Sequence, residues 1–115
     1  MIDIKGTNVT IMVKDMDLAI KFYQNIGFTI KNRWDNHYAM LSVEGLTIGL
    51  HPTTKTELSS GSISIGMMID EINSAKELLS KNEIEHKFET GKSGNFVYFN
   101  DLDGTDLYFM QPMWQ

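Results

Sequence analysis

Hydrophobic and polar residues alternate in the same order in both halves of the chain. Each half opens with an alternating run typical of a half-buried strand. A run follows whose apolar residues recur every three or four positions, which is typical of a helix. Three more alternating runs, separated by turn residues, complete the half. The expected strands are 7–13, 28–34, 37–43 and 46–52 in the first half, and 62–69, 84–90, 94–100 and 105–112 in the second.

Two amphipathic helices are expected, one after the first strand of each half. The first begins near Asp15 or Asp17, either of which can cap a helix, and it ends at Gly27. The second spans 70–82. We expect their apolar faces to comprise Leu18, Ala19, Phe22, Tyr23 and Ile26 in the first helix, and Ile72, Ala75, Leu78 and Leu79 in the second.

The two halves can be aligned with one another as an internal repeat. Shifting the first strand by 56 residues places Asn8 on Ser64. Shifting the last strand of the first half by 59 residues places Gly49 on Tyr108. A repeat of this kind predicts that one structural unit occurs twice.

The repeat sets the expected domain organisation. The tract 53–62 between the halves is polar and rich in Ser and Thr, which is typical of a linker. We expect a single domain, residues 1–115, that comprises module one (1–56) and module two (60–115).

Composition and charge argue against several classes of function. The chain of 115 residues has no cysteine, which excludes disulfides, thiolate metal sites and a cysteine nucleophile. The net charge is -5 and the basic residues are scattered, so we expect neither nucleic acid nor a membrane as a partner. The N-terminus lacks the basic start and apolar run of a signal peptide. We expect a cytoplasmic protein.

Three stretches of the chain carry a family resemblance. They are NVTIMVKDMDLAIKFYQNIGF, ISIGMMIDEINSAKELLSKNEIE and FNDLDGTDLYFMQ. The first resembles the opening strand and helix of the vicinal oxygen chelate superfamily, which comprises glyoxalases, bleomycin-resistance proteins and extradiol dioxygenases. The second resembles the opening of that family's second module, and the third resembles its closing strand.

The resemblance implies a fold and a kind of site. The implied fold is α+β, with two βαβββ modules that form a cupped mixed sheet and helices on its outer face. The resemblance also implies a ligand pocket in the cup and a homodimer. Metal-dependent members of the family hold a divalent ion with four side chains, usually His and Glu, and the ion polarises vicinal oxygens of the substrate.

Those four positions carry other residue types in this chain. The first His of the family motif corresponds to Asn8, and the Glu of the fourth strand corresponds to Gly49. The His of the second module corresponds to Ser64, and the closing Glu corresponds to Tyr108. None of the four is a strong ligand for Zn, Ni, Fe or Mn. We therefore expect no metal and no cofactor.

A binding slot for a small molecule is expected in place of the ion. Strand alternation should direct Tyr108 toward the cup, with Gly49 opposite leaving room. Small polar groups together with Met and aromatic side chains suit a flat or apolar ligand held by a few hydrogen bonds. Trp114 could stack on the ligand or close a dimer seam. The expected ligand-binding residues are Asn8, Thr10, Met12, Trp34, Gly49, His51, Ser64, Met68, Tyr108 and Met110.

Three functions stay open at this point. The first is a metal-independent protein of the glyoxalase/bleomycin-resistance type that sequesters an apolar or aromatic ligand in the sheet cup. The second is a divalent-metal-dependent lyase, isomerase or dioxygenase with atypical ligands, such as His51 with Glu44 or Asp106. The third is a structural homodimer whose cup is filled. His37 and His86 are expected at the surface, His86 within the sixth strand.

Overall fold

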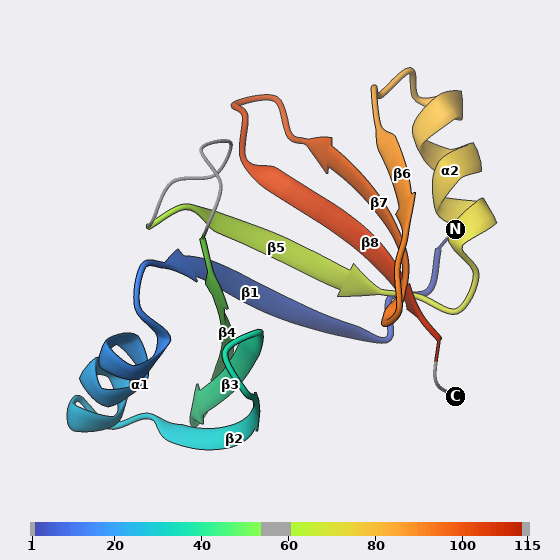
Figure 1. The fold of residues 1–115 in the computed structure, drawn as a ribbon. Helices are drawn as coiled ribbons and strands as arrows, with labels where there is room; N and C mark the ends of the chain where they lie inside the picture. The colour runs from blue at the N-terminus through green and yellow to red at the C-terminus, as the bar shows by residue number, and fades with distance from the viewer. Residues whose placement is uncertain (1, 54–60, 114–115) are drawn as a thin grey trace. The chain divides into compact units, whose positions relative to one another are not determined.

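The computed structural model describes residues 2–53 and 61–113. Their helices and strands follow one another in the order expected from the sequence (Figure 1). Residues 54–60 of the expected linker lie outside the described residues. The elements are β1 (Gly6–Val13), α1 (Met16–Asn25), β2 (Thr29–Trp34), β3 (Tyr38–Val43), β4 (Leu46–Pro52), β5 (Ile63–Met68), α2 (Ile72–Lys81), β6 (Lys87–Thr90), β7 (Gly94–Asn100) and β8 (Asp106–Pro112).

Strand pairing within each half gives a mixed arrangement of four strands. In module one the strand order is β2-β3-β4-β1, with β1 parallel to β4 and the other neighbours antiparallel. In module two the order is β5-β8-β7-β6, with β5 parallel to β8 and the other neighbours antiparallel. These pairings confirm an α+β fold built from two βαβββ modules.

The strand register confirms the internal repeat. Thr10 pairs with Gly49 in module one, and Gly66 pairs with Tyr108 in module two. The shift of 56 residues carries Thr10 to Gly66, and the shift of 59 carries Gly49 to Tyr108. Equivalent residues therefore face one another across the parallel strand pair of both modules.

The chain forms two compact units whose boundary differs from a simple division into halves. One unit spans Asn8–Ile63, and the other contains the chain from Ser64 together with the N-terminal segment up to Thr7. The amide of Lys5 donates to the carbonyl of Met68 at 2.8 Å, and Ile2 packs against the core of module two. The first residues of β1 thus belong with module two.

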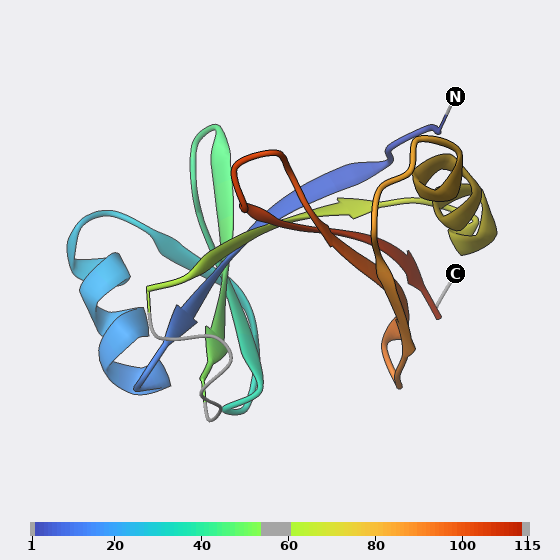
Figure 2. The same ribbon diagram turned by 90° about the horizontal axis from the view of Figure 1, so that it is seen from above.

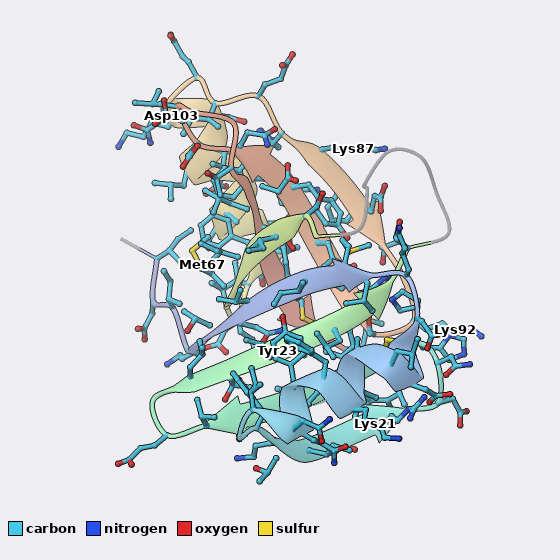
Figure 3. The ribbon with its side chains drawn as sticks, turned by 90° about the vertical axis from the view of Figure 1, so that its left-hand side faces the viewer. Lys21, Tyr23, Met67, Lys87, Lys92 and Asp103 are labelled. Carbon is cyan, nitrogen blue, oxygen red and sulfur yellow. The ribbon has the colours of Figure 1, made fainter. Side chains whose placement is uncertain are left out.

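Helix α1 packs on its sheet through one narrow stripe. The carboxylate of Asp15 accepts a hydrogen bond from the Leu18 amide at 3.0 Å and caps the helix. Met16 and Ile20 are buried. Tyr23 packs beside them, against the strands of module one (Figure 3).

Three residues that were expected on the buried face of α1 are instead exposed. Leu18 is 67% exposed, Phe22 59% and Ile26 61%. Successive residues of a helix are rotated by about 100°, which places Leu18 and Phe22 on the side away from the stripe formed by Met16 and Ile20. Ile26 is the C-cap residue, past the end of the helix. Because the segment carries two apolar stripes, spacing alone does not identify the one that packs.

Helix α2 buries the face expected from its sequence, with one exception. Ile72, Ala75 and Leu79 are 4% exposed or less. Leu78, expected on the same face, is 36% exposed and lies at its edge. Neither described helix is long and apolar enough to cross a membrane.

Each helix covers one face of its own sheet, as Figure 2 illustrates for α2 beside β7 and β8. Ile11 and Leu50 lie in the core shared with α1, and Phe109 lies in the core shared with α2. Strand neighbours point to opposite faces. Thr10 and Tyr108 therefore lie on the faces that carry no helix, which we call the helix-free faces.

The sixth strand begins later than the sequence predicts. It starts at Lys87 rather than at Ile84, so His86 lies outside it. The amide of Ile84 donates back to the Leu79 carbonyl at 2.8 Å, and Glu83 adopts a positive φ of 57°. Backbone amides after the helix therefore donate to the last carbonyls of α2. The hydrogen bonds between β6 and β7 begin only after this segment.

We expect Gln111→Ala to lower the free energy of unfolding by about 1 kcal/mol. The side-chain oxygen of Gln111 accepts from the amide of Ile72 at 2.8 Å and satisfies a donor in the first turn of α2. Urea denaturation followed by circular dichroism would measure the change. Gln24→Ala, at an exposed position in α1, is the matched control, and an equal loss in both variants would contradict the capping role.

Candidate functional site

The helix-free face of module one is built around Tyr38, at the start of β3. A Cβ added to Gly49 on the neighbouring strand would overlap the hydroxyl oxygen and Cζ of Tyr38, and would lie 3.1 Å from Nδ2 of Asn8. The phenol head thus fills the space that a side chain at position 49 would need. The expectation that Gly49 leaves room is wrong, because Tyr38 occupies the space beside this glycine.

A hydrogen-bond network ties Tyr38 to β1. The amide nitrogen of Asn8 donates to the Tyr38 hydroxyl. The hydroxyls of Tyr38 and Thr10 are 3.1 Å apart, and Thr10 is only 7% exposed. The side-chain oxygen of Asn8 is buried, and among residues 2–53 and 61–113 it has no hydrogen-bond partner. A buried acceptor without a partner is costly in a folded protein, because it loses its hydrogen bonds to water and gains none in return.

Two further rings lie beside Tyr38. The Trp34 ring is 5.9 Å from it, tilted by 46°, and the His51 ring is 6.3 Å away in an edge-on arrangement. His51 pairs with Met12 in the strand register, and its Nδ1 lies 2.9 Å from the Pro52 carbonyl. Module one therefore gathers Asn8, Thr10, Trp34, Gly49 and His51 around one tyrosine, and Met12 lies beside His51 in the strand register.

The helix-free face of module two is aromatic. A Cβ added to Gly66 would overlap the Cζ and hydroxyl of Tyr108 and lie 2.5 Å from its Cε2, so this ring covers the glycine. Phe96 and Tyr98 of β7 stack on one another, with ring centroids 5.8 Å apart and planes within 5°. The Tyr108 ring lies 6.0 Å from Phe96 and 5.9 Å from Tyr98.

The remaining expected residues of module two lie along the same strand pair. Ser64 pairs with Asp106, and Met68 pairs with Met110, on either side of the pair formed by Gly66 and Tyr108. Met68 is 39% exposed. Trp114 lies outside the described residues.

The residues at the four metal positions do not fit a metal ion. Asn8, Gly49, Ser64 and Tyr108 offer an amide, a bare backbone and two hydroxyls, whereas first-row metals select imidazole and carboxylate. Within the described part of the chain, no group of three or more His, Asp or Glu side chains is placed to hold an ion.

Glu44 and His51, the alternative metal ligands within module one, lie far apart. Glu44 lies in the turn before β4, and His51 lies near the other end of that strand. The strand residues between them span roughly 16 Å at 3.3 Å per residue, which is too far for one ion. The structure therefore does not bring Glu44 and His51 into one site.

Sequence reasoning missed three aromatic residues: Tyr38, Phe96 and Tyr98. The alternating pattern predicts Tyr38 only as the start of a strand, and the other two only as strand residues. A signal existed for Phe96 and Tyr98, because their spacing of two places both rings on one face of a strand. The hydrogen bonds of Tyr38 to β1 join residues 28 and 30 positions apart, and no local pattern predicts them.

Comparison with solved structures finds the same fold in several proteins. A superfamily member from Vibrio splendidus 12B01, described as a glyoxalase/bleomycin resistance protein/dioxygenase, is 17% identical, with a TM-score of 0.68 over 92% of this chain and 97% of that one. A protein described as NAD-dependent benzaldehyde dehydrogenase from Legionella pneumophila is 17% identical, with a TM-score of 0.80 over 93% and 99%. The methylmalonyl-CoA epimerase of Mycobacterium tuberculosis is 16% identical, with a TM-score of 0.73 over 95% and 89%.

At these identities the likeness concerns the fold, and the named activities belong to those proteins. Among curated proteins, no sequence matches this chain. The sequence profile of one family, described as the Glyoxalase/Bleomycin resistance protein/Dioxygenase superfamily, matches residues 7–109. The match covers most of both modules and all four metal positions. The chain therefore belongs to the glyoxalase/bleomycin resistance protein/dioxygenase superfamily.

Proposed function

We propose that this protein is a metal-independent small-molecule-binding protein that sequesters an apolar or aromatic ligand against its helix-free sheet faces. One observation carries the proposal. Tyr38 joins two of the family's metal positions, Asn8 and Gly49, in a neutral network. Its phenol fills the space that a metal-binding side chain at position 49 would need. No residue of this network carries a charge that would attract a divalent ion.

The character of the exposed groups supports an organic ligand. Both helix-free faces carry aromatic rings and methionines beside a few hydroxyl and amide groups. Flat organic molecules are bound by such mixtures, because rings provide contact area and a few polar atoms fix the orientation.

Binding is expected to be independent of metal. We would purify the protein without a His tag and dialyse it against EDTA. A panel of neutral and cationic aromatic compounds would then be titrated, with intrinsic fluorescence as the readout, because Trp34 lies next to Tyr38. Removal of metal should change each dissociation constant by less than about twofold, since no step of the proposed binding uses an ion.

Elemental analysis of the same samples is the control. Near-stoichiometric Ni, Zn, Mn or Fe that survives dialysis, or binding that returns only when such an ion is added, would contradict the proposal. The variant Trp34→Phe tests the readout, because a fluorescence change that originates in module one should disappear in it.

A structural role with filled faces is the second candidate. It is favoured by the two tyrosines that cover Gly49 and Gly66, which would be the expected arrangement if the faces bound nothing. This candidate predicts that no compound of the panel binds. The homodimer implied by the family resemblance stays a prediction.

A further inference from the structure

The aromatic cluster of module two lies beside a carboxylate. The cluster consists of Phe96, Tyr98 and Tyr108, whose ring centroids are 5.8–6.0 Å apart. Strand β6 runs next to β7, and Glu89 of β6 pairs with Phe96 in the register. Cross-strand partners project to the same face of a sheet. The carboxylate of Glu89 is therefore on the face that carries the rings.

The negative charge of Glu89 acts on Tyr98, a residue of the cluster. Burial raises the pKa of Tyr98 to about 12, and the charge of Glu89 and the neighbouring Tyr108 contribute to this rise as smaller causes. Tyr98 is 38% exposed, so part of its ring faces solvent while it remains a neutral phenol at physiological pH. The cluster thus presents electron-rich ring faces next to a fixed negative charge.

Lys87, which is labelled in Figure 3, pairs with Tyr98 in the register and is the other charged residue of β6 on this face. Its ammonium lies 3.3 Å from the Glu89 carboxylate, and its side chain is 75% exposed. An ion pair this exposed contributes little free energy, because water and salt screen it. A ligand cation can therefore replace Lys87 as the partner of Glu89 at small cost.

The same module already holds a cation on a ring. On the opposite face of β6, the ammonium of Lys76 lies 3.7 Å from the centre of the Phe88 ring. Cations are attracted to ring faces by the quadrupole of the π-system, most strongly when partly desolvated. The overall charge of -5 adds a long-range bias toward positively charged ligands.

We propose that the cluster of Phe96, Tyr98 and Tyr108 binds the cationic head of an organic ammonium ligand, with Glu89 as its counter-charge. This inference rests on the proposed function, because it names the ligand class that the protein would sequester. The ammonium, quaternary or protonated, contacts the exposed part of the Tyr98 ring, and the apolar remainder of the ligand lies along the neighbouring rings and methionines.

Two isosteric probes test the inference. The cation 3-(trimethylammonio)phenol and the neutral 3-tert-butylphenol have nearly the same shape and differ in charge. Titration followed by NMR shifts of the aromatic side chains should show the cation binding at least about fivefold more tightly, in line with cation–π contacts of about 1 kcal/mol or more. The preference should weaken as the salt concentration rises, because salt screens Glu89.

Three variants locate the effect. Tyr98→Leu should weaken binding of the cationic probe by about five- to tenfold and leave the neutral probe within about twofold, since only the cation uses the ring quadrupole. Glu89→Gln should remove most of the salt dependence. Phe88→Leu is the matched control, because it removes a ring from the opposite face of the same sheet and should change neither probe.

The outcomes separate the two proposals. Equal affinity for both probes, or a cation preference that survives Tyr98→Leu, would overturn the ammonium site while leaving metal-independent binding intact. If neither probe nor any compound of the aromatic panel binds the protein, both proposals fail. If binding of either probe requires added metal, the proposed function fails by itself.

Discussion

Replacing Gly49 by alanine is expected to lower the free energy of unfolding by about 2 kcal/mol, within the range observed when extra atoms are forced into packed sites. The new methyl group would overlap the phenol head of Tyr38, so the ring must leave its position. When it moves, the hydrogen bonds of its hydroxyl with Asn8 and Thr10 are lost as well. Urea denaturation monitored by fluorescence and circular dichroism would measure the loss.

A double-mutant cycle assigns this cost to Tyr38. Tyr38→Ala removes the obstacle, so Gly49→Ala should cost almost nothing in that background, and the coupling between the two substitutions should be about 2 kcal/mol. Gly91→Ala is the matched control, because a Cβ at that glycine meets nothing within 4 Å. Additive effects of the two substitutions would show that Tyr38 does not occupy the space at position 49.

The order of elements and the repeat were predictable because they depend on local patterns. Alternation identified every strand, and the shift that aligned Asn8 with Ser64 also matched the register of the parallel strand pairs. Patterns of this kind arise from the geometry of one segment against one buried face. Such patterns therefore predict strands and helices even when the residues that pack against them are unknown.

Predictions failed where two segments compete for one space or one surface. Helix α1 carries two apolar stripes, and only tertiary packing decides that Met16 is buried and Phe22 is not. The sequence shows that Gly49 has no side chain, but the residue that fills the space, Tyr38, lies on another strand. Strand β6 begins later than predicted, because the amide of Ile84 donates to a carbonyl at the end of α2 and not to a neighbouring strand. Each failure has a non-local cause.

The candidate site shows the same division. The family motif locates the four metal positions in the sequence, and the residue types at those positions are enough to argue against a metal. The surroundings of these positions depend on Tyr38 in one module and on the rings around Tyr108 in the other. In both modules a glycine on one strand lies under a tyrosine from its neighbour, although the two pairs are not equivalent in the repeat.

Gly66→Ala tests the second of these pairs and is expected to affect both stability and ligand binding. The methyl group would overlap Tyr108 and displace its ring, with a cost of about 2 kcal/mol in the free energy of unfolding. Displacing this ring also separates it from Phe96 and Tyr98, so the cationic probe should bind about tenfold more weakly, as expected when a desolvated cation–π contact is lost.

The control for Gly66→Ala is Gly6→Ala, where a Cβ would lie 4.0 Å from Met68 in ordinary contact. That substitution should leave both stability and probe binding nearly unchanged. In a Tyr108→Ala background, Gly66→Ala should lose its cost, since the methyl group then has space. If Gly66→Ala keeps full stability and full probe affinity, the position of the Tyr108 ring does not depend on this glycine. The arrangement of the aromatic cluster would then have another cause.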